Sequence, residues 1–397
     1  MTGVCGDPPI NLDICDDEAN FRETILSQVD GYGGAATGAG IDMMGPSGDL
    51  DRCTVTNRNA SGPGSLPWCV SSGRWVNFDP TVFPENPTAN FQAGGNLALL
   101  DPIPVPQTIF LDGPLVVPSN VTIEAAGACV RIANLNGGDT VRVSGNNVIL
   151  YNLEVYGHGP RTFTPGNGAG AAGSAGSSLG STLNIAGSTV WASRMKVWQG
   201  DQHALRVSGG DVTVSHSQIW NIAGSAGYIT GGPFTSHHNW WPDSMTNTPW
   251  VDGAVAHQYS DFVMHAGQDA FDDRWRASIV TNGGCLTSES NQFTPRSFCD
   301  SLDCYVNNQG GNLATSGNIF LPPLRPDFFT NINQQAFECN ESGTCPPIPY
   351  PYTADPPCTP PEGFVYNGSP QWPVDYQCDD TGWIDGDSRT DLGVSCP

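Results

Sequence analysis

The chain has 397 residues, of which only 14% are charged, and its 39 acidic against 15 basic residues give a formal net charge of −24. A surface of this charge repels every phosphate that approaches it, which argues against nucleic acid and anionic membrane surfaces as partners. The alternative is that the acidic surface simply keeps a secreted protein soluble. No apolar run is long enough to cross a membrane, so we expect no membrane span.

Cysteine usage points to an oxidising compartment. The thirteen cysteines show no C-x-x-C or C-x-x-C-H spacing, which favours disulfides over a zinc or haem site. Most of them lie near the two ends of the chain, while Cys129 stands alone in the middle. We therefore expect a secreted or cell-surface protein. An odd number of cysteines leaves one thiol free or bonded to a second chain.

Residues 1–52 form an N-terminal arm that is rich in Gly, Ala and acidic residues, with one short helix expected at 16–29. This composition is typical of a mobile segment. Such an arm becomes ordered only where disulfides, the body of the protein or a neighbouring subunit hold it. The arm is therefore one indication of self-association.

The composition changes at Cys53. The stretch CTVTNRNASGPGSLPWCV predicts a strand, a Ser-Gly-Pro-Gly turn and a short helix, with Ser65 as the N-cap and Pro67 in the first turn. This helix would cap the open end of a solenoid, whose exposed strand edges otherwise invite aggregation. Early strands follow in RWVNFDP, QTIFLDG and LVVPSNVTIEAAG.

From Asn146 onward the chain repeats a short strand with polar corners. NNVILYNLEV, STVWASRMKV, GDVTVSHSQIW and GPFTSHHNWW share this form, and Val212 and Phe234 open equivalent strands 22 residues apart. The pattern continues in HQYSDFV, RASIVTNG, GCLTSESNQF and GNLATSGNIF. Because one turn of such a repeat cannot bury its own apolar face, the turns must stack. We predict an all-β solenoid, a right-handed parallel β-helix, over residues 53–325.

Two segments depart from the repeat. A stretch of Gly, Ala and Ser at residues 166–181 interrupts it and is expected to lie over one face. Residues 326–397 form a Pro- and Cys-rich C-terminal extension, which we interpret as extended, polyproline-like chain held by disulfides. We expect this extension to lie along the flank of the solenoid or to reach onto another copy.

The segment VTVSHSQIW…FTSHHNWWPDSMTNTPWVDG resembles the core of the secreted pectate lyase family, which has a VTVS-type strand, an HHN strand and an Arg-x-Pro-x-x-Arg signature. STVWAS from Ser188 is similar to that family's Val-Trp-Ile-Asp-His strand. The resemblance covers residues 53–320 and implies the same parallel β-helix. It also implies a cleft in which an Arg removes a proton beside a uronate carboxylate that Ca²⁺ holds.

The residues that serve this chemistry in the family are replaced here. The first Arg of the signature falls on Asn247 and the second on Asp252, so that only Pro249 is kept. The positions of the other family site residues are taken by or near Ser181, Ser193, Arg194, Gln202, Arg206, Ala223 and Gly224. An amide cannot act as the base, and a cation in place of a carboxylate expels calcium. We therefore predict no catalytic residue of the family type, no metal site and no calcium-dependent lyase activity. We also expect no cofactor; calcium is the alternative left open, although the family's ligands are absent.

Two other groups of residues suggest chemistry. His216, His237 and His238 lie on successive turns, where they would form a general base or a metal site. The alternative is that they are structural, as part of the HHN strand. The acidic run at 269–273 offers the paired carboxylates of a glycosidase, or is a solvated loop.

Four tryptophans fall in the groove region that the resemblance implies: Trp220, Trp240, Trp241 and Trp250. Together with His216 they are the candidate carbohydrate-binding residues, because aromatic faces stack on sugar rings. The alternative is that the four side chains are buried under the Gly-rich stretch or in a protein interface, where Trp is also enriched.

Three hypotheses follow for the function. The first is an extracellular, non-catalytic protein of the pectate lyase fold that serves as a structural or assembly subunit and associates with itself through its terminal extensions. The second is a polysaccharide lyase or glycoside hydrolase with relocated site residues. The third is a carbohydrate-binding protein that holds a polysaccharide on its Trp cluster.

Overall fold

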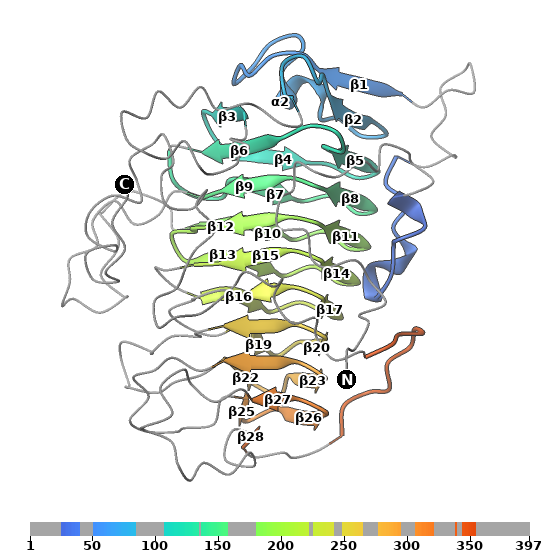
Figure 1. Ribbon diagram of the computed structural model, residues 1–397, viewed down its shortest axis with the longest axis vertical. Coiled ribbons are helices and arrows are strands. Elements are labelled where there is room, and N and C mark those ends of the chain that lie inside the picture. Colours follow the sequence, from blue (N-terminus) through green and yellow to red (C-terminus); the bar gives the residue numbers. More distant parts are fainter. Residues whose placement is uncertain are drawn as a thin grey trace, which may run out of the picture.

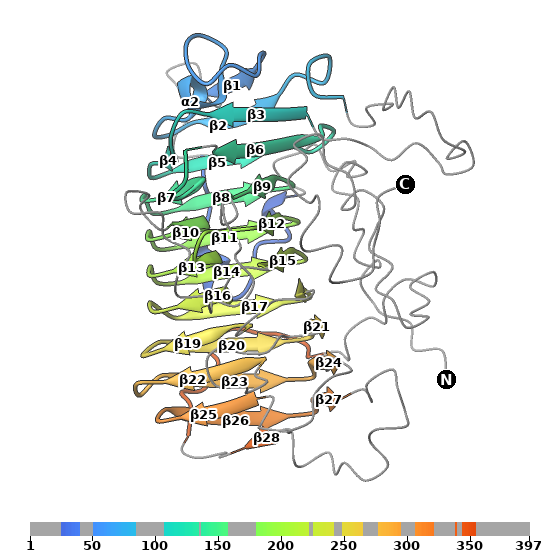
Figure 2. The same cartoon turned by 90° about the vertical axis from the view of Figure 1, so that its left-hand side faces the viewer.

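The computed structural model describes residues 25–39, 51–84, 107–134, 136–157, 180–221, 225–241, 248–264, 277–294, 306–320, 338–339 and 344–354. These parts of the chain form a parallel β-helix (Figures 1 and 2), which confirms the predicted fold class. Three parallel sheets of 10, 9 and 9 strands run along it, and we name them sheets I, II and III.

Sheet I has the strand order β1-β2-β5-β8-β11-β14-β17-β20-β23-β26. Its strands are β1 (Arg52–Val55), β2 (Trp75–Phe78), β5 (Val121–Glu124), β8 (Val148–Tyr151), β11 (Val190–Ser193), β14 (Val212–Ser215), β17 (Phe234–His237), β20 (Val255–Tyr259), β23 (Cys285–Glu289) and β26 (Asn312–Ser316). Val212 pairs with Phe234 in register, which confirms the spacing predicted from the repeat.

Sheets II and III each run through nine strands. Sheet II contains β4 (Leu115–Val117), β7 (Val141–Val143), β10 (Ser181–Ile185), β13 (His203–Val207), β16 (Ser225–Ile229), β19 (Trp250–Asp252), β22 (Ser278–Thr281), β25 (Val306–Gln309) and β28 (Glu338–Cys339). Sheet III contains β3 (Gln107–Leu111), β6 (Val130–Asn134), β9 (Glu154–Tyr156), β12 (Lys196–Trp198), β15 (Gln218–Trp220), β18 (Trp240–Trp241), β21 (Phe262–Met264), β24 (Gln292–Thr294) and β27 (Ile319–Phe320). The last strand of sheet II thus lies inside the segment that the sequence predicted as an extension.

The interior of the solenoid is filled by stacked apolar side chains. One column on sheet I contains Val148, Val190, Val212, Phe234, Ala256, Leu286 and Leu313, which are paired in register and buried. Because strand residues alternate between the two faces, every second residue of a strand points into this core. The other residues of each strand form the outer faces.

A ladder of hydrogen bonds holds the short turns between sheets I and III together. The Oδ1 atoms of Asn239, Asp261, Asn291 and Asn318 each accept from the backbone N–H of the preceding coil's equivalent residue, at 2.8–2.9 Å. The residue before each of these ladder positions adopts positive φ: His238, Ser260, Ser290 and Gly317. The His-His-Asn sequence therefore supplies a turn as well as the end of a strand.

The N-terminal end of the solenoid is closed by α2 (Leu66–Cys69), as predicted (Figure 1). Ser65 Oγ caps the helix by accepting from the Trp68 N–H at 3.4 Å, and Pro67 lies in the first turn. A disulfide joins Cys69 to Cys53 of β1. The cap is thereby fixed to the first strand of sheet I.

Five cysteines in the described residues are disulfide-bonded. Besides Cys53–Cys69, a second disulfide joins Cys285 to Cys345, and Cys129 is also disulfide-bonded. Cys129 therefore does not stand alone, contrary to its isolated position in the sequence. None of the helices in the described ranges is long and apolar enough to cross a membrane.

Residues 25–39 lie along the outer face of sheet I and include a short 3-10 helix, η2 (Tyr32–Ala35). Ile25, Ala36 and Ala39 pack there against a cluster that includes Trp75, Ile149, Tyr151 and Trp191. The body of the protein, one of the three anchors considered for the arm, thus holds this part. Most of the helix expected at 16–29 and of the stretch at 166–181 lies outside the described residues.

Candidate functional site

One row of residues runs along the outer face of sheet II. Arg142, Asn184, Arg206, Tyr228 and Trp250 pair in register on five neighbouring strands, β7, β10, β13, β16 and β19. Their neighbours along the strands point the other way, into the core. We call these five residues the sheet II row.

The aromatic members of the row pack against one another. The ring centroids of Tyr228 and Trp250 are 4.8 Å apart, with their planes tilted by 54°. His203, at the start of β13, stacks on the other side of Tyr228 at 4.8 Å and 27°. All three side chains are partly exposed, so they form an aromatic surface rather than part of the core.

Polar atoms at the edge of this aromatic surface have no partner within the described part of the protein. They are Asn184 Oδ1, His203 Nδ1 and Arg206 Nε, all of which are buried. Buried polar atoms are nearly always hydrogen-bonded, so an unpaired group indicates a water molecule or a ligand. Three such atoms on two adjacent strands mark this part of sheet II as the candidate site.

The carboxylates beside the row are engaged by protein donors. Asp139 accepts from Arg142 Nε at 2.7 Å, from Asn184 Nδ2 at 2.9 Å and from the Ser181 N–H at 2.9 Å. Over the residues that the structure describes, no group of three or more His, Cys, Asp or Glu is placed to hold a metal ion. The absence of a metal site and of a cofactor remains a prediction.

Asp252, the position of the family's second Arg, lies at the other end of the row. Its carboxylate accepts from the Tyr228 hydroxyl at 2.9 Å, from the Thr281 hydroxyl at 2.8 Å and from Asn282. Burial raises the pKa of Asp252, but these hydrogen bonds outweigh it and hold the pKa below its ordinary value. Asp252 thus orients Tyr228. Asn247, the position of the family's base, lies outside the described residues.

His203 is a neutral base in this site at neutral pH. Burial, and then the positive charge of Arg206, lower the pKa of His203 from 6.5 to about 4. The imidazole therefore keeps a lone pair with which it can accept a hydrogen bond or a proton.

The structure separates the four tryptophans that the sequence grouped together. Trp240 and Trp241 lie on β18 of sheet III, and Trp241 is completely buried in the core. Both rings are buried, with 5% of Trp240 and 0% of Trp241 exposed, so neither has an open face for a sugar in the described structure, and their role in carbohydrate binding stays a prediction. Trp220 lies on β15, also in sheet III, and its side chain is outside the described residues. Only Trp250 lies on the sheet II row.

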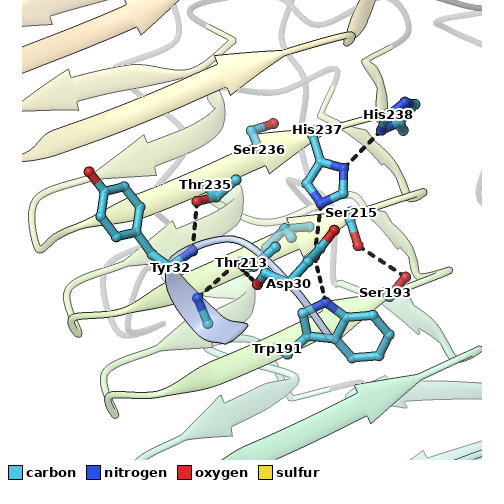
Figure 3. Close-up of polar contacts among 12 residues, drawn as sticks. Asp30, Tyr32, Trp191, Ser193, Thr213, Ser215, Thr235, Ser236, His237 and His238 are labelled. Carbon is cyan, nitrogen blue, oxygen red and sulfur yellow. Dashed lines mark hydrogen bonds and ion pairs between the residues drawn. The ribbon is translucent and has the colours of Figure 1, made fainter. Parts of the chain in front are cut away.

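The histidines on successive turns lie at a different face. His216 stacks on His238 at 5.0 Å, and His237 Nδ1 lies 2.8 Å from His238 Nδ1. His237 is buried beneath the N-terminal segment, where its Nε2 lies 3.0 Å from Asp30 Oδ1 (Figure 3). This geometry favours the structural interpretation of the His-His-Asn strand. The acidic run at 269–273 lies outside the described residues.

Sequence reasoning missed Tyr228, placed His203 only near the histidines of the successive turns, and considered Arg206 only as a lost calcium ligand. A signal existed in the strands HALRV and SAGYI, where period-two alternation places Arg206 and Tyr228 on the outer face. Their pairing becomes visible only through the register of the strands, which the sequence alone does not provide.

No protein-family model matches the sequence, and no curated protein matches it. Among solved structures, the chain is similar to Jun a 1, the major allergen from cedar pollen, with 16% identity, a TM-score of 0.48 and coverage of 85% of this chain and 95% of that one. It is also similar to a Bacillus subtilis pectate lyase mutant (15% identity, TM-score 0.47, coverage 83% and 92%) and to a pectate lyase bound to a hexasaccharide (15%, 0.48, 86% and 95%). With such low identities and TM-scores, no argument about function rests on these similarities. The class that the chain's own sheets define is that of the parallel β-helix proteins.

Proposed function

We propose that this protein is an extracellular saccharide-binding protein that holds its ligand on the outer face of sheet II. The observation that carries the proposal is the alignment of Arg206, Tyr228 and Trp250 on three neighbouring strands, beside buried polar atoms without partners. Binding sites for small molecules combine an aromatic or apolar surface with a few polar groups that fix orientation. A sugar ring offers both an apolar face for the aromatic rings and hydroxyl groups for Arg206 and Asn184.

The extracellular location in this proposal is supported by the disulfides. Cys53–Cys69 and Cys285–Cys345 lie at opposite ends of the solenoid. Such bonds persist in oxidising compartments and are rare in the cytosol.

We expect Trp250→Ala to weaken saccharide binding. Loss of a central aromatic anchor costs about 2 kcal/mol, or roughly a 30-fold rise in Kd. A glycan array would identify ligands, and calorimetry with the best ligand would compare the variants. Trp68→Ala is the matched control, because Trp68 is 51% exposed on the cap helix, away from sheet II. Equal loss of binding in both variants, or unchanged binding in Trp250→Ala, would rule out this surface.

A second candidate function, polysaccharide cleavage by elimination, is favoured by the neutral base His203 beside the cation Arg206. Elimination needs a base at the carbon acid and a positive charge that stabilises the carboxylate. Our proposal predicts no rise in ultraviolet absorbance from unsaturated ends when the protein is incubated with acidic polysaccharides, with or without Ca²⁺. A rise that His203→Gln abolishes would establish the second candidate instead.

The role of an assembly subunit, the first hypothesis from the sequence, also remains a proposal. The described terminal segments dock on their own chain, which removes the ordered arm as an argument for association. The odd cysteine count still supports it, because one thiol is available for a second chain. Comparing the native mass under oxidising and reducing conditions separates this role from that of a monomeric binding protein.

A further inference from the structure

The two terminal segments of the chain meet on the outer face of sheet I. In Figure 1 the N-terminal segment at residues 25–39 lies beside the upper strands, and the C-terminal segment at residues 344–354 lies beside the lower ones. They touch where the ring of Tyr32 packs edge-on against Tyr350, with centroids 5.0 Å apart. The contacts of the two segments reach from Trp75 on β2 to Cys285 on β23.

The N-terminal segment is held by side chains of sheet I and its turns rather than by a strand ladder: Asn147 accepts from the Gly38 N–H, and Asp30 contacts His237 and Trp191. The N–H groups of Gly33 and Tyr32 donate to Thr213 Oγ1 at 2.8 Å and to Thr235 Oγ1 at 3.0 Å (Figure 3). Thr213 Oγ1 in turn donates to the carbonyl oxygen of Asp30 at 2.9 Å. The segment lies so close to the sheet that a Cβ atom on Gly33 would collide with the backbone of β11.

The C-terminal segment is held by one disulfide and two tyrosines. Cys345 is bonded to Cys285 on β23. Tyr352 Oη donates to Glu289 Oε2 at 2.7 Å. Tyr350 Oη lies 2.7 Å from His257 Nδ1 and 2.7 Å from Thr235 Oγ1, and His257 Nε2 lies 3.1 Å from Glu289 Oε2.

Only one assignment of donors and acceptors satisfies all the hydrogen bonds between Glu289, His257, Tyr350 and Thr235. An ionised Glu289 can only accept, so His257 donates through Nε2–H, and a neutral His257 then has a bare Nδ1. Tyr350 must donate its proton to this Nδ1, which leaves the Tyr350 oxygen to accept from the Thr235 hydroxyl. The Thr235 oxygen accepts from the Tyr32 N–H, so the hydroxyl proton of Thr235 is left to donate to Tyr350. We call the chain from Tyr32 through Thr235, Tyr350 and His257 to Glu289 the relay.

We propose that the relay is a proton-operated clasp, which holds both terminal segments on sheet I while His257 is neutral and lets them open when His257 binds a proton. A protonated Nδ1 and the Tyr350 hydroxyl would both be donors, so Tyr350 has to turn away. Its contacts with Thr235 and Tyr32 then fail as well. The Cys285–Cys345 disulfide keeps the segment tethered, so that it swings open without leaving.

The groups around His257 set the pH at which the clasp opens. Burial lowers the pKa of His257 to about 4, against the opposing effect of Glu289, and the charge of His237 on β17 adds to the lowering. Tyr259 on β20 stacks on the His257 ring at 4.6 Å, and burial raises its pKa far above neutral. Hydrogen bonding to Glu289 and burial likewise raise the pKa of Tyr352 to about 12. Burial also raises the pKa of Tyr350, so all three hydroxyls keep their protons throughout the acid range.

Hydrogen exchange on the full-length, disulfide-intact protein tests the clasp. Residues 25–39 and 344–354 should be protected at neutral pH. They should lose protection near pH 4, the pKa of His257, while the strands of sheets II and III stay protected. Tyr350→Phe removes one donor and one acceptor from the relay, so exchange in both segments should rise about tenfold at neutral pH.

Two histidine variants separate the clasp from general acid sensitivity. His257→Gln keeps an N–H for Glu289 but cannot titrate, so opening of the segments should no longer depend on pH between about 6.5 and about 4. His203→Gln is the matched control, because burial lowers the pKa of His203 equally but it faces sheet II. The proposal is overturned if the segments stay protected until the strands unfold, if Tyr350→Phe exchanges like the unchanged protein, or if both histidine variants shift the opening alike.

Discussion

Replacement of Asp261 by Ala is expected to lower the free energy of unfolding by about 4 kcal/mol, the largest loss that we expect from any single substitution in the described core. Asp261 is a completely buried carboxylic acid in the ladder between sheets I and III. Its Oδ2 accepts from the Ser236 hydroxyl, from Trp241 Nε1 at 3.0 Å and from Gln258 Nε2 at 3.2 Å. Alanine would leave all these donors buried and unpaired.

Asp261→Asn is the matched control, with an expected loss of about 1–2 kcal/mol. Three other coils carry Asn at the same ladder position, and each donates through Nδ2 to a backbone carbonyl of the preceding coil. An Asn at residue 261 would find the equivalent carbonyl at Ser236 while keeping the bond from the Asn239 N–H. Urea unfolding monitored by circular dichroism would measure both variants. Equal losses in the two would mean that the acceptors on Asp261 do not stabilise the coil.

The repeat was predictable from the sequence because it depends on local physics. A coil of short strands with polar corners cannot bury its apolar side chains alone, so the 22-residue spacing of Val212 and Phe234 predicted their pairing in register. The cap helix was equally local, since Ser65 and Pro67 define where a helix begins. Both predictions required only patterns that can be read along the sequence.

The candidate site was not predictable in this way. Trp240 and Trp241 are adjacent in sequence and both are buried, yet only Trp241 belongs to the main apolar core, because a strand alternates faces at every residue. Trp250 joins Tyr228 only through the register between β16 and β19. A proximity argument along the chain therefore grouped residues that belong to different sheets.

The position of the terminal segments depends on contacts between residues 207 and 93 positions apart in the sequence. Asp30 meets His237 and Tyr350 meets His257, and no local pattern indicates these pairs. The glycines at residues 31, 33 and 38 carry a signal that is easily misread. They looked like a flexible linker, but a Cβ atom at each would collide with sheet I.

The second large effect expected is a loss of stability in acid that originates at His203. Burial and the charge of Arg206 lower its pKa in the folded protein from 6.5 to about 4. Because the unfolded chain binds the proton more tightly, the contribution of neutral His203 is complete above pH 6.5 and is lost as the pH falls toward 4. A shift of this size corresponds to roughly 3 kcal/mol.

His203→Gln should reduce this slope, because glutamine has no proton to bind. Urea titrations would give the free energy of unfolding of the unchanged protein and of His203→Gln at pH values of about 7, 5.5 and 4. These values cover the range between the unfolded and folded pKa of His203, so they measure the slope. His257 contributes a loss of the same sign, so the slope of His203→Gln should fall by about half and that of the double variant with His257→Gln by more. Asp261 has the opposite effect on stability in acid. Burial raises the pKa of Asp261, so the folded protein binds this proton more tightly than the unfolded chain does and gains stability as the pH falls. An identical pH dependence in the unchanged protein and in His203→Gln would show that His203 is solvated in the folded state, and the unpaired Nδ1 would then no longer mark a ligand site.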